Sequence, residues 1–311
     1  MPDQRPVITV VGSFAVGLTL RAPRFPVAGE TLLGTDFDMG PGGKGSNQAV
    51  GAARLGAESH LVGLIGEDTF GDMAVLLYQR EGVGMEHLRR TAERNTGVGF
   101  ITLNAAGENH IVLDMGANHL LTPAAVDAAE ALIARSQAVL TVLEISPATA
   151  ARAMAVARAH GVISILNPAP AQALGDDVLA AVDVLTPNET ELRIISGLAP
   201  DDATPTLELA HRLQARGVRQ LVVTRGGQGA LVVTADGATH HVPSVSVPVV
   251  DTTGAGDAFT CALAVALAEG RPLLEAARFA AVAGALAVTR LGVIPALPTR
   301  AEVEARLAAS A

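Results

Sequence analysis

The feature that most restricts the fold is a regular alternation of short apolar runs and helical stretches in the second half of the chain. The apolar runs predict strands at residues 138–143, 162–166, 184–186 and 221–224. Strands joined through helices lie parallel, and the crossover helices cover the sheet. We therefore predict the α/β class, with a three-layer α/β/α arrangement around a mostly parallel central sheet. The run at residues 7–11 is expected to join that sheet.

Two patches without a helical pattern interrupt this alternation, at about residues 14–40 and 95–115. The second patch is typical of a β-hairpin that turns at Gly107. We predict that both patches form one small β-sheet, a lid inserted into a single domain of residues 1–311. Further predicted elements include a short strand at 30–33 and one continuous helix at 123–135.

Composition and charge argue against several classes of function. The net charge is −9 and no stretch is rich in Lys and Arg, so nucleic acid is not expected as a partner. No apolar run reaches the ~18 residues of a membrane span, and the N-terminus lacks a signal-peptide pattern. The single cysteine, Cys261, cannot form an intrachain disulfide. We expect a cytoplasmic protein with a small-molecule partner and no membrane partner.

A glycine-rich turn, DTTGAGDAF at residues 251–259, opens a helix of small apolar residues. The first N–H groups of a helix lack intrahelical acceptors and carry partial positive charge. Because Gly254 and Gly256 have no Cβ, an anion can approach these groups closely. Asp257 stands beside them and can accept a proton. This pattern suits transfer of a phosphoryl group to a hydroxyl. The alternative is an ordinary helix start with an Asp in its first turn.

A second glycine-rich stretch, GGKGSNQA at residues 42–49, leads into another predicted helix. It is not a Walker A loop, because Lys44 is followed by Gly45 rather than by Ser or Thr. Its glycines let the backbone approach a ligand, while Lys44 and Asn47 offer hydrogen-bond donors. Such donors suit a polyhydroxylated molecule.

These motifs together resemble the signatures of the ribokinase-like (PfkB) carbohydrate kinases. GGKGSNQA at 42–49 is similar to the N-terminal signature of the family, and DTTGAGDAF at 251–259 to the C-terminal one. NPAP at 167–170, TPNETE at 186–191 and TRGG at 224–227 resemble further family motifs in the same order. The resemblance covers essentially the whole chain. It implies the ribokinase-like fold and ATP-dependent phosphorylation of the primary hydroxyl of a small, ribose-like sugar.

The resemblance assigns catalytic roles to the glycine-rich turn. Asp257 would be the base that removes the proton of the sugar hydroxyl. The backbone N–H groups of Gly254, Ala255 and Gly256 would hold the charge that develops on the transferred phosphoryl group.

ATP and Mg²⁺ are implied as cofactors. Asn188 and Glu191 match an Asn-x-x-Glu motif that organises Mg²⁺ and phosphate through water. The same spacing is that of a helix capping box, and the two roles are compatible. The residues implied at the nucleotide are Asn188, Thr224, Gly226, Gly227, Gly229 and Gly256.

Activation by K⁺ is a further implication of the resemblance. Asp251 is the matching side-chain ligand, and the region that would supply backbone carbonyls contains Thr253, Ala287, Arg290 and Gly292. The alternative is that Asp251 only braces its loop.

The sugar contacts implied by the resemblance are Gly42, Gly43, Lys44, Asn47, Glu144 and Asp257. After the first strand the family carries polar residues that bind sugar hydroxyls, whereas this chain has Phe14 and Val16. We predict that these two side chains form an apolar wall of the sugar site. A site that lacks the polar acceptor should not select for the hydroxyl it bound. We therefore expect a deoxy or modified pentose, or a nucleoside-like compound, to fit better than ribose.

Two alternative functions remain open. One is a nucleoside or other small-metabolite kinase of the same family, and the other is a sugar-binding regulator without catalysis, which would have no need of Asp257. The resemblance also implies a homodimer through the lid, because exposed strand edges can pair with a second copy.

Overall fold

The computed structural model describes residues 5–309, and its main feature is a nine-stranded sheet with the strand order β13-β12-β11-β10-β9-β8-β1-β4-β5. All pairings from β11 through to β5 are parallel, and β12 and β13 extend one edge with antiparallel pairings. The strands are β1 (Val7–Val11), β4 (Glu58–Gly66), β5 (Leu88–Thr91), β8 (Ala138–Val142), β9 (Ile163–Asn167), β10 (Val184–Leu185), β11 (Gln220–Thr224), β12 (Ala230–Val233) and β13 (Thr239–Val242).

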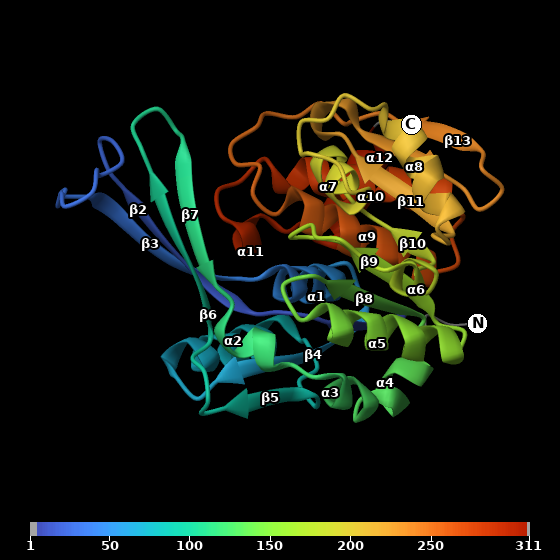
Figure 1. The fold of residues 1–311 in the computed structure, drawn as a ribbon, viewed down its shortest axis with the longest axis horizontal. Helices are drawn as coiled ribbons and strands as arrows, with labels where there is room; N and C mark the ends of the chain where they lie inside the picture. Colours follow the sequence, from blue (N-terminus) through green and yellow to red (C-terminus); the bar gives the residue numbers. More distant parts are fainter. Residues whose placement is uncertain (1–4, 310–311) are drawn as a thin grey trace.

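Helices cover both faces of this sheet, so the predicted three-layer arrangement is confirmed (Figure 1). Alternate residues of β1 point to opposite faces, with Ile8 and Val10 in one hydrophobic core and Val11 in the other. The first core contains residues of α1 (Lys44–Arg54), α2 (Thr69–Glu81), α9 (Ala255–Ala268), α10 (Leu273–Ala287) and α12 (Arg300–Ala308). The second contains residues of α3 (Pro123–Asp127), α4 (Glu130–Arg135), α5 (Pro147–Ala159), α6 (Asp176–Leu179), α7 (Glu189–Ile195) and α8 (Thr206–Ala215).

Four more strands form a separate small sheet with the order β3-β2-β6-β7. They are β2 (Ala15–Arg21), β3 (Thr35–Gly42), β6 (Gly97–Leu103) and β7 (Asn109–Asp114). The small sheet projects from the main body, at the left of Figure 1. The two patches predicted at 14–40 and 95–115 thus form one sheet, joined by the parallel pairing of β2 with β6.

Three local predictions differ from the structure. The helix expected at 123–135 is two short helices, α3 and α4, because the Ala129 N–H bonds to Val126 O and ends the first one. The strand expected at 30–33 is absent from the described secondary structure. The short edge strands β5 and β13 were not predicted. The remaining short elements are η1 (Gly116–Leu120), η2 (Gly226–Gln228) and α11 (Val293–Ala296).

The order of the strands creates a switch point between β1 and β8. From β1 the chain runs outward through β4 and β5 on one side, and later through β8, β9 and β10 on the other. In open α/β sheets, ligands bind beyond the carboxyl ends of the strands at such a point.

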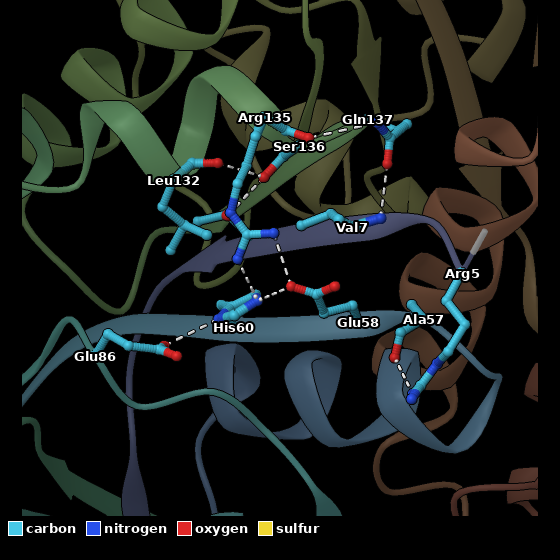
Figure 2. A network of polar contacts seen from close by, with 11 residues as sticks. Arg5, Val7, Ala57, Glu58, His60, Glu86, Leu132, Arg135, Ser136 and Gln137 are labelled. Carbon is cyan, nitrogen blue, oxygen red and sulfur yellow. Dashed lines mark hydrogen bonds and ion pairs between the residues drawn. The ribbon is translucent and has the colours of Figure 1, made fainter.

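A polar network ties the opposite, amino end of the sheet together (Figure 2). His60 of β4 lies between Glu58, 2.9 Å from Nε2, and Glu86, 3.0 Å from Nδ1. Arg135, at the end of α4, donates to Glu58 at 2.7 Å. These contacts join β4 to α4 and to the segment before β5, so we assign them a structural role.

Within the described part of the chain, none of the helices combines the length and the apolar character needed to cross a bilayer.

Candidate active site

Two glycines at the N-terminus of α9, Gly254 and Gly256, have different surroundings: the first is crowded and the second faces open space. Gly254 caps the helix with a φ of 81°, and a Cβ there would lie 2.6 Å from Cγ1 of Val293. For both reasons, any residue other than glycine at this position would strain the backbone. A Cβ on Gly256 would meet no atom within 4 Å. Open space therefore adjoins the first turn of the helix, as an anion site requires.

Free N–H groups are available at this turn, although fewer than predicted. Within residues 5–309, neither Gly254 nor Gly256 donates its N–H to a backbone carbonyl outside the helix. The N–H of Ala255 points to Thr252 O at 3.3 Å. An anion would therefore meet the groups of Gly254 and Gly256 first.

Asp257 is nearly fully buried, and amide donors from α1 bind both of its carboxylate oxygens. Asn47 Nδ2 donates to Oδ2 at 2.7 Å, and Gln48 Nε2 donates to Oδ1 at 3.1 Å. The helices approach closely because Gly51 of α1 faces Cys261 of α9, where no side chain larger than hydrogen fits. Two motifs that are 210 residues apart in sequence are thus in direct contact.

A second buried carboxylate, Glu144, follows β8 at the same edge of the sheet. Its Oε2 accepts hydrogen bonds from Ser13 Oγ at 2.5 Å and from the Lys44 N–H at 2.8 Å. Burial raises the pKa of Glu144, while the bond from Ser13 and the charge of Lys44 lower it. Among the described residues no group donates to Oε1 of Glu144, so this oxygen is available to a ligand.

Lys44 lies close to three carboxylates. Asp257 makes the largest contribution to raising its pKa, which burial opposes and which Glu144 and Glu191 reinforce. The predicted residues of the two glycine-rich stretches therefore share one electrostatic environment.

Gly42 and Gly43 bring the backbone of the loop against the start of β2. Gly42 pairs with Ala15, and Gly43 has a φ of 86°, with a Cβ position only 2.7 Å from the Ala15 nitrogen. A side chain at Gly43 would push the loop away from the strand.

Phe14 and Val16 differ from their predicted placement. Both side chains are buried in the core, 1% and 0% exposed, and the Phe14 ring packs edge-on against Tyr78. The residues that alternate with them along β2, and so point to the other face, are Ala15 and Gly17. The prediction that Phe14 and Val16 form an apolar wall of the sugar site is therefore corrected, because neither side chain is accessible.

Asn188 and Glu191 form the predicted capping box at the start of α7. Asn188 Oδ1 accepts from the Glu191 N–H, and Glu191 Oε2 accepts from the Asn188 N–H, both at 2.8 Å. Burial raises the pKa of Glu191. Thr224 pairs with Asn188 in an isolated parallel bridge, which places the end of β11 beside this cap.

The glycine-rich loop after Thr224 is the turn η2. Gly226 has a φ of 53° and Gly229 a φ of 86°. Cβ atoms at Gly226 and Gly227 would meet nothing within 4 Å, so this loop has an open side next to the capping box.

Asp251 braces the loop that precedes α9. Its Oδ1 accepts from the Thr253 N–H at 2.9 Å and from Thr253 Oγ1 at 2.6 Å, and Oδ2 accepts from the Gly292 N–H at 3.2 Å. Burial acts to raise the pKa of Asp251, but these hydrogen bonds outweigh it and hold the pKa below its usual value. The Asp251 N–H in turn donates to Val288 O.

The predicted K⁺ region is thus compact. The Asp251 loop meets the segment from the end of α10, at Ala287, through Arg290 to Gly292. The Arg290 side chain itself pairs with Glu302, so only its carbonyl is left for such a site. Carboxylate and carbonyl oxygens are the donors that hard cations prefer, and Asp251 lies beside this backbone segment.

Three polar residues of the site were not predicted: Ser13, Gln48 and Asn167. Each stands inside or beside a motif that was recognised. A sequence signal was available only in their position, at the carboxyl end of a strand or next to Asn47. The directions of their side chains depend on tertiary packing.

The structure sets an open helix N-terminus beside a buried carboxylate in a three-layer α/β/α fold, an arrangement known from enzymes that bind anionic substrates. Residues 6–300 match the sequence profile of the pfkB family carbohydrate kinases. The chain belongs to this family, whose members are ATP-dependent phosphotransferases.

Individual relatives agree with this assignment. A ribokinase from Haemophilus influenzae is 37% identical over 298 residues, 96% of this chain and 97% of the relative. A deoxyribokinase from Salmonella typhimurium is 34% identical over 293 residues, 94% of this chain and 95% of the relative. The structure of Arabidopsis thaliana ribokinase complexed with ribose and ATP matches with a TM-score of 0.90 at 30% identity, over 98% of this chain and 99% of that one.

Proposed function

We propose that this protein transfers the γ-phosphoryl group of ATP to the primary hydroxyl of a pentose, with Asp257 as the base. The observation that carries the proposal is the pairing of this buried carboxylate with the open, glycine-lined N-terminus of α9. As the sugar oxygen attacks the γ-phosphorus, its proton passes to Asp257 and the bond to ADP breaks.

The anion site stabilises the charge on the phosphoryl group during transfer. The N–H groups of Gly254 and Gly256, which have no backbone acceptor outside the helix among the described residues, would face the phosphoryl group at the N-terminus of α9, where the helix dipole adds to their effect. Ala255 contributes once its weak contact with Thr252 O opens.

The sugar would lie among Glu144, Lys44 and Asn47. The Oε1 atom of Glu144 would accept a hydrogen bond from one sugar hydroxyl, and the Lys44 ammonium would donate to another. Gly42 and Gly43 let the sugar contact the backbone of the loop.

The nucleotide would extend from the α9 N-terminus towards the cap of α7. Asn188 and Thr224 lie side by side there, next to the open side of Gly226 and Gly227, and Gly229 closes that loop. Mg²⁺ commonly keeps several waters and uses few protein carboxylates. Glu191 fits that role, because one of its oxygens is outside the capping box. The bound ion would neutralise charge on the phosphates.

K⁺ would bind between Asp251 and the carbonyls of Thr253, Ala287, Arg290 and Gly292. The hydrogen bonds that Asp251 accepts from the N–H groups of Thr253 and Gly292 support this, because they hold the two segments together. A bound cation would brace the same turn.

For the substrate we propose a 2-deoxypentose or a modified pentose rather than ribose. Phe14 and Val16 stand where the resemblance implies polar residues that bind sugar hydroxyls. Both side chains are apolar and buried, so the chain offers no hydroxyl acceptor at these two positions. Similarity to a deoxyribokinase is in keeping with this choice.

The test is ADP release by the purified protein with ATP and Mg²⁺, over a panel of ribose, 2-deoxyribose and nucleosides. We expect kcat/KM for 2-deoxyribose to equal or exceed that for ribose. A clear preference for ribose would contradict the substrate proposal, and a preference for a nucleoside would select the nucleoside kinase instead. No turnover of any member would favour the non-catalytic regulator.

We further propose that the small sheet is a lid and that two copies dimerise through it. Apolar side chains form a row across all four strands, from Met39 through Leu18 and Phe100 to Val112. Phe100 is 57% and Val112 69% exposed, which is costly unless a second copy covers them.

A further inference from the structure

We infer that Gln48 is a positioning residue that sets the orientation of the Asp257 carboxylate. The inference rests on the proposed function, in which Asp257 is the base. Gln48 is fully buried in α1, and its Nε2 lies 3.1 Å from Asp257 Oδ1 and 3.1 Å from Asn167 Oδ1. It therefore links the base to the carboxyl end of β9.

Asp257, Gln48, Asn167 and the Thr186 carbonyl form a series of hydrogen bonds. The Thr186 carbonyl determines which group donates in each of them. Asn167 Nδ2 donates to Thr186 O at 2.9 Å, and a backbone carbonyl can only accept. Asn167 must then present its Oδ1 to Gln48, and Gln48 must present its amino group to Asn167. The second proton of that amino group points to Asp257.

Gln48 can therefore only donate to Asp257 and cannot accept from it. The Oε1 atom of Gln48 is buried without a partner among the described residues, which is unfavourable for stability. Both of its amino protons are used, so the residue retains an unpaired oxygen while its donors serve Asn167 and Asp257. This cost is understandable if the orientation of Asp257 matters for activity.

The two carboxylate oxygens of Asp257 thus have different neighbours. Oδ2 accepts from Asn47, which the resemblance places at the sugar, so Oδ2 is the oxygen that takes the hydroxyl proton. Oδ1 is bound from the buried side by Gln48, which touches neither sugar nor nucleotide in this arrangement. A second tie, Thr186 Oγ1 to Thr260 Oγ1 at 3.3 Å, returns the chain to α9 one turn beyond Asp257.

The test replaces Gln48 by Met, which has similar volume and no donor. We expect kcat to fall about 10- to 100-fold, the range for loss of a hydrogen bond to a charged group, with KM for sugar and ATP within about twofold. In an Asp257→Asn background, Gln48→Met should change the residual kcat by less than about twofold, because the partner is already altered. Thr141→Val, which removes a buried hydroxyl bonded to Val11 O, is the matched control and should keep full activity.

Two results would overturn the inference. One is an unchanged kcat in Gln48→Met, and the other is an equal loss in the Asp257→Asn background, which indicates general structural damage. If the Met variant folds poorly, Gln48→Glu retains the shape but faces Oδ1 with an acceptor, and it should lose at least as much kcat; full activity there also overturns the inference. A wild-type protein without kinase activity on any sugar would instead contradict the proposed function itself.

Discussion

At the scale of single residues, the candidate site contains two buried carboxylates, Asp257 and Glu144, with different hydrogen-bond partners. Both oxygens of Asp257 are bound by amide donors, so its orientation is set before a ligand arrives. Glu144 uses one oxygen for Ser13 and the Lys44 N–H and leaves the other open. We therefore propose proton transfer for the first carboxylate and sugar binding for the second.

Replacement of Glu144 by Gln tests this division. Gln keeps an oxygen for Ser13 and Lys44, but it presents an amino group to the sugar in place of a charged acceptor. We expect KM for the sugar to rise about 10- to 100-fold, with KM for ATP unchanged. The measurement is steady-state kinetics with each substrate varied in turn. An unchanged sugar KM would show that Glu144 does not bind the substrate.

The sequence predicts site residues where they belong to a recognised motif, but it does not predict the direction of their side chains. The contact of Asn47 with Asp257 joins two recognised signatures. The apolar wall was expected from the positions that Phe14 and Val16 occupy after the first strand, but both side chains lie in the core, and which way they point depends on tertiary packing. The contact of Gln48 with Asp257 depends on the rotation of α1 about its axis, which also needs the tertiary structure.

At the scale of elements, the N-terminus of α9 can be probed with two glycine substitutions. Gly256→Ala adds a Cβ in open space within a helix, so stability should stay equal or rise by up to about 1 kcal/mol. The same methyl group enters the proposed anion site, so we expect kcat/KM for ATP to fall about 10-fold or more. Thermal unfolding and kinetics measure the two effects separately.

Gly254→Ala is the matched comparison. There the φ of 81° and the nearby Val293 make the substitution destabilising, by about 1–3 kcal/mol. Full ATP kinetics in Gly256→Ala would show that no anion binds at this turn.

The contact between α1 and α2 predicts a pH dependence of stability. Arg54 donates to both oxygens of Glu81, at 2.8 and 3.0 Å, and chiefly through these bonds lowers the pKa of Glu81 against the effect of burial. When the pKa of a carboxylate is lower in the folded protein than in the unfolded chain, its ionised form stabilises the fold. This stabilisation is complete above the unfolded-state pKa, and it is lost as the pH falls through the folded-state pKa. Glu81→Gln should therefore cost about 1–2 kcal/mol at pH 7.

Urea unfolding at several pH values checks this prediction. The difference between wild type and Glu81→Gln should begin to shrink as the pH falls below about 4.3, the pKa of Glu in the unfolded chain, and should vanish once Glu81 is protonated in the folded protein as well. A difference independent of pH would mean that the pair does not depend on the charge of Glu81.

Element boundaries were predictable where apolar runs were long and flanked by clear signals. Strand β1 coincides with the predicted 7–11, and the Ser146 cap of α5 forms as its sequence indicates. Helices α3 and α4 were predicted as one, because the Ala-rich stretch between them carries no breaker. Strand β5 has only four residues, two of them arginines, so it carries no apolar run, and it pairs in parallel with the edge of β4.

On the scale of the whole molecule, the small sheet projects from the main body (Figure 1) and carries exposed apolar side chains such as Phe100 and Val112. If two copies pair there, Phe100→Glu should convert a dimer into a monomer, because a charge would be buried in the row with Val112 and Leu18. Light scattering after size exclusion gives the mass directly. Leu76→Glu changes a similarly exposed side chain on α2 and should leave the dimer intact. A wild-type mass equal to one chain would refute the proposed dimer.

The most direct test of the central proposal is the turnover of Asp257→Asn with ATP, Mg²⁺ and the best sugar of the panel. Asn keeps the shape of the side chain and removes the proton acceptor, so kcat should fall about 10²- to 10⁴-fold while thermal stability stays near that of the wild type. Asp72→Asn, at an exposed position on α2, should retain full activity. An Asp257→Asn enzyme that keeps kcat within about twofold of the wild type would contradict the role of Asp257 as the base.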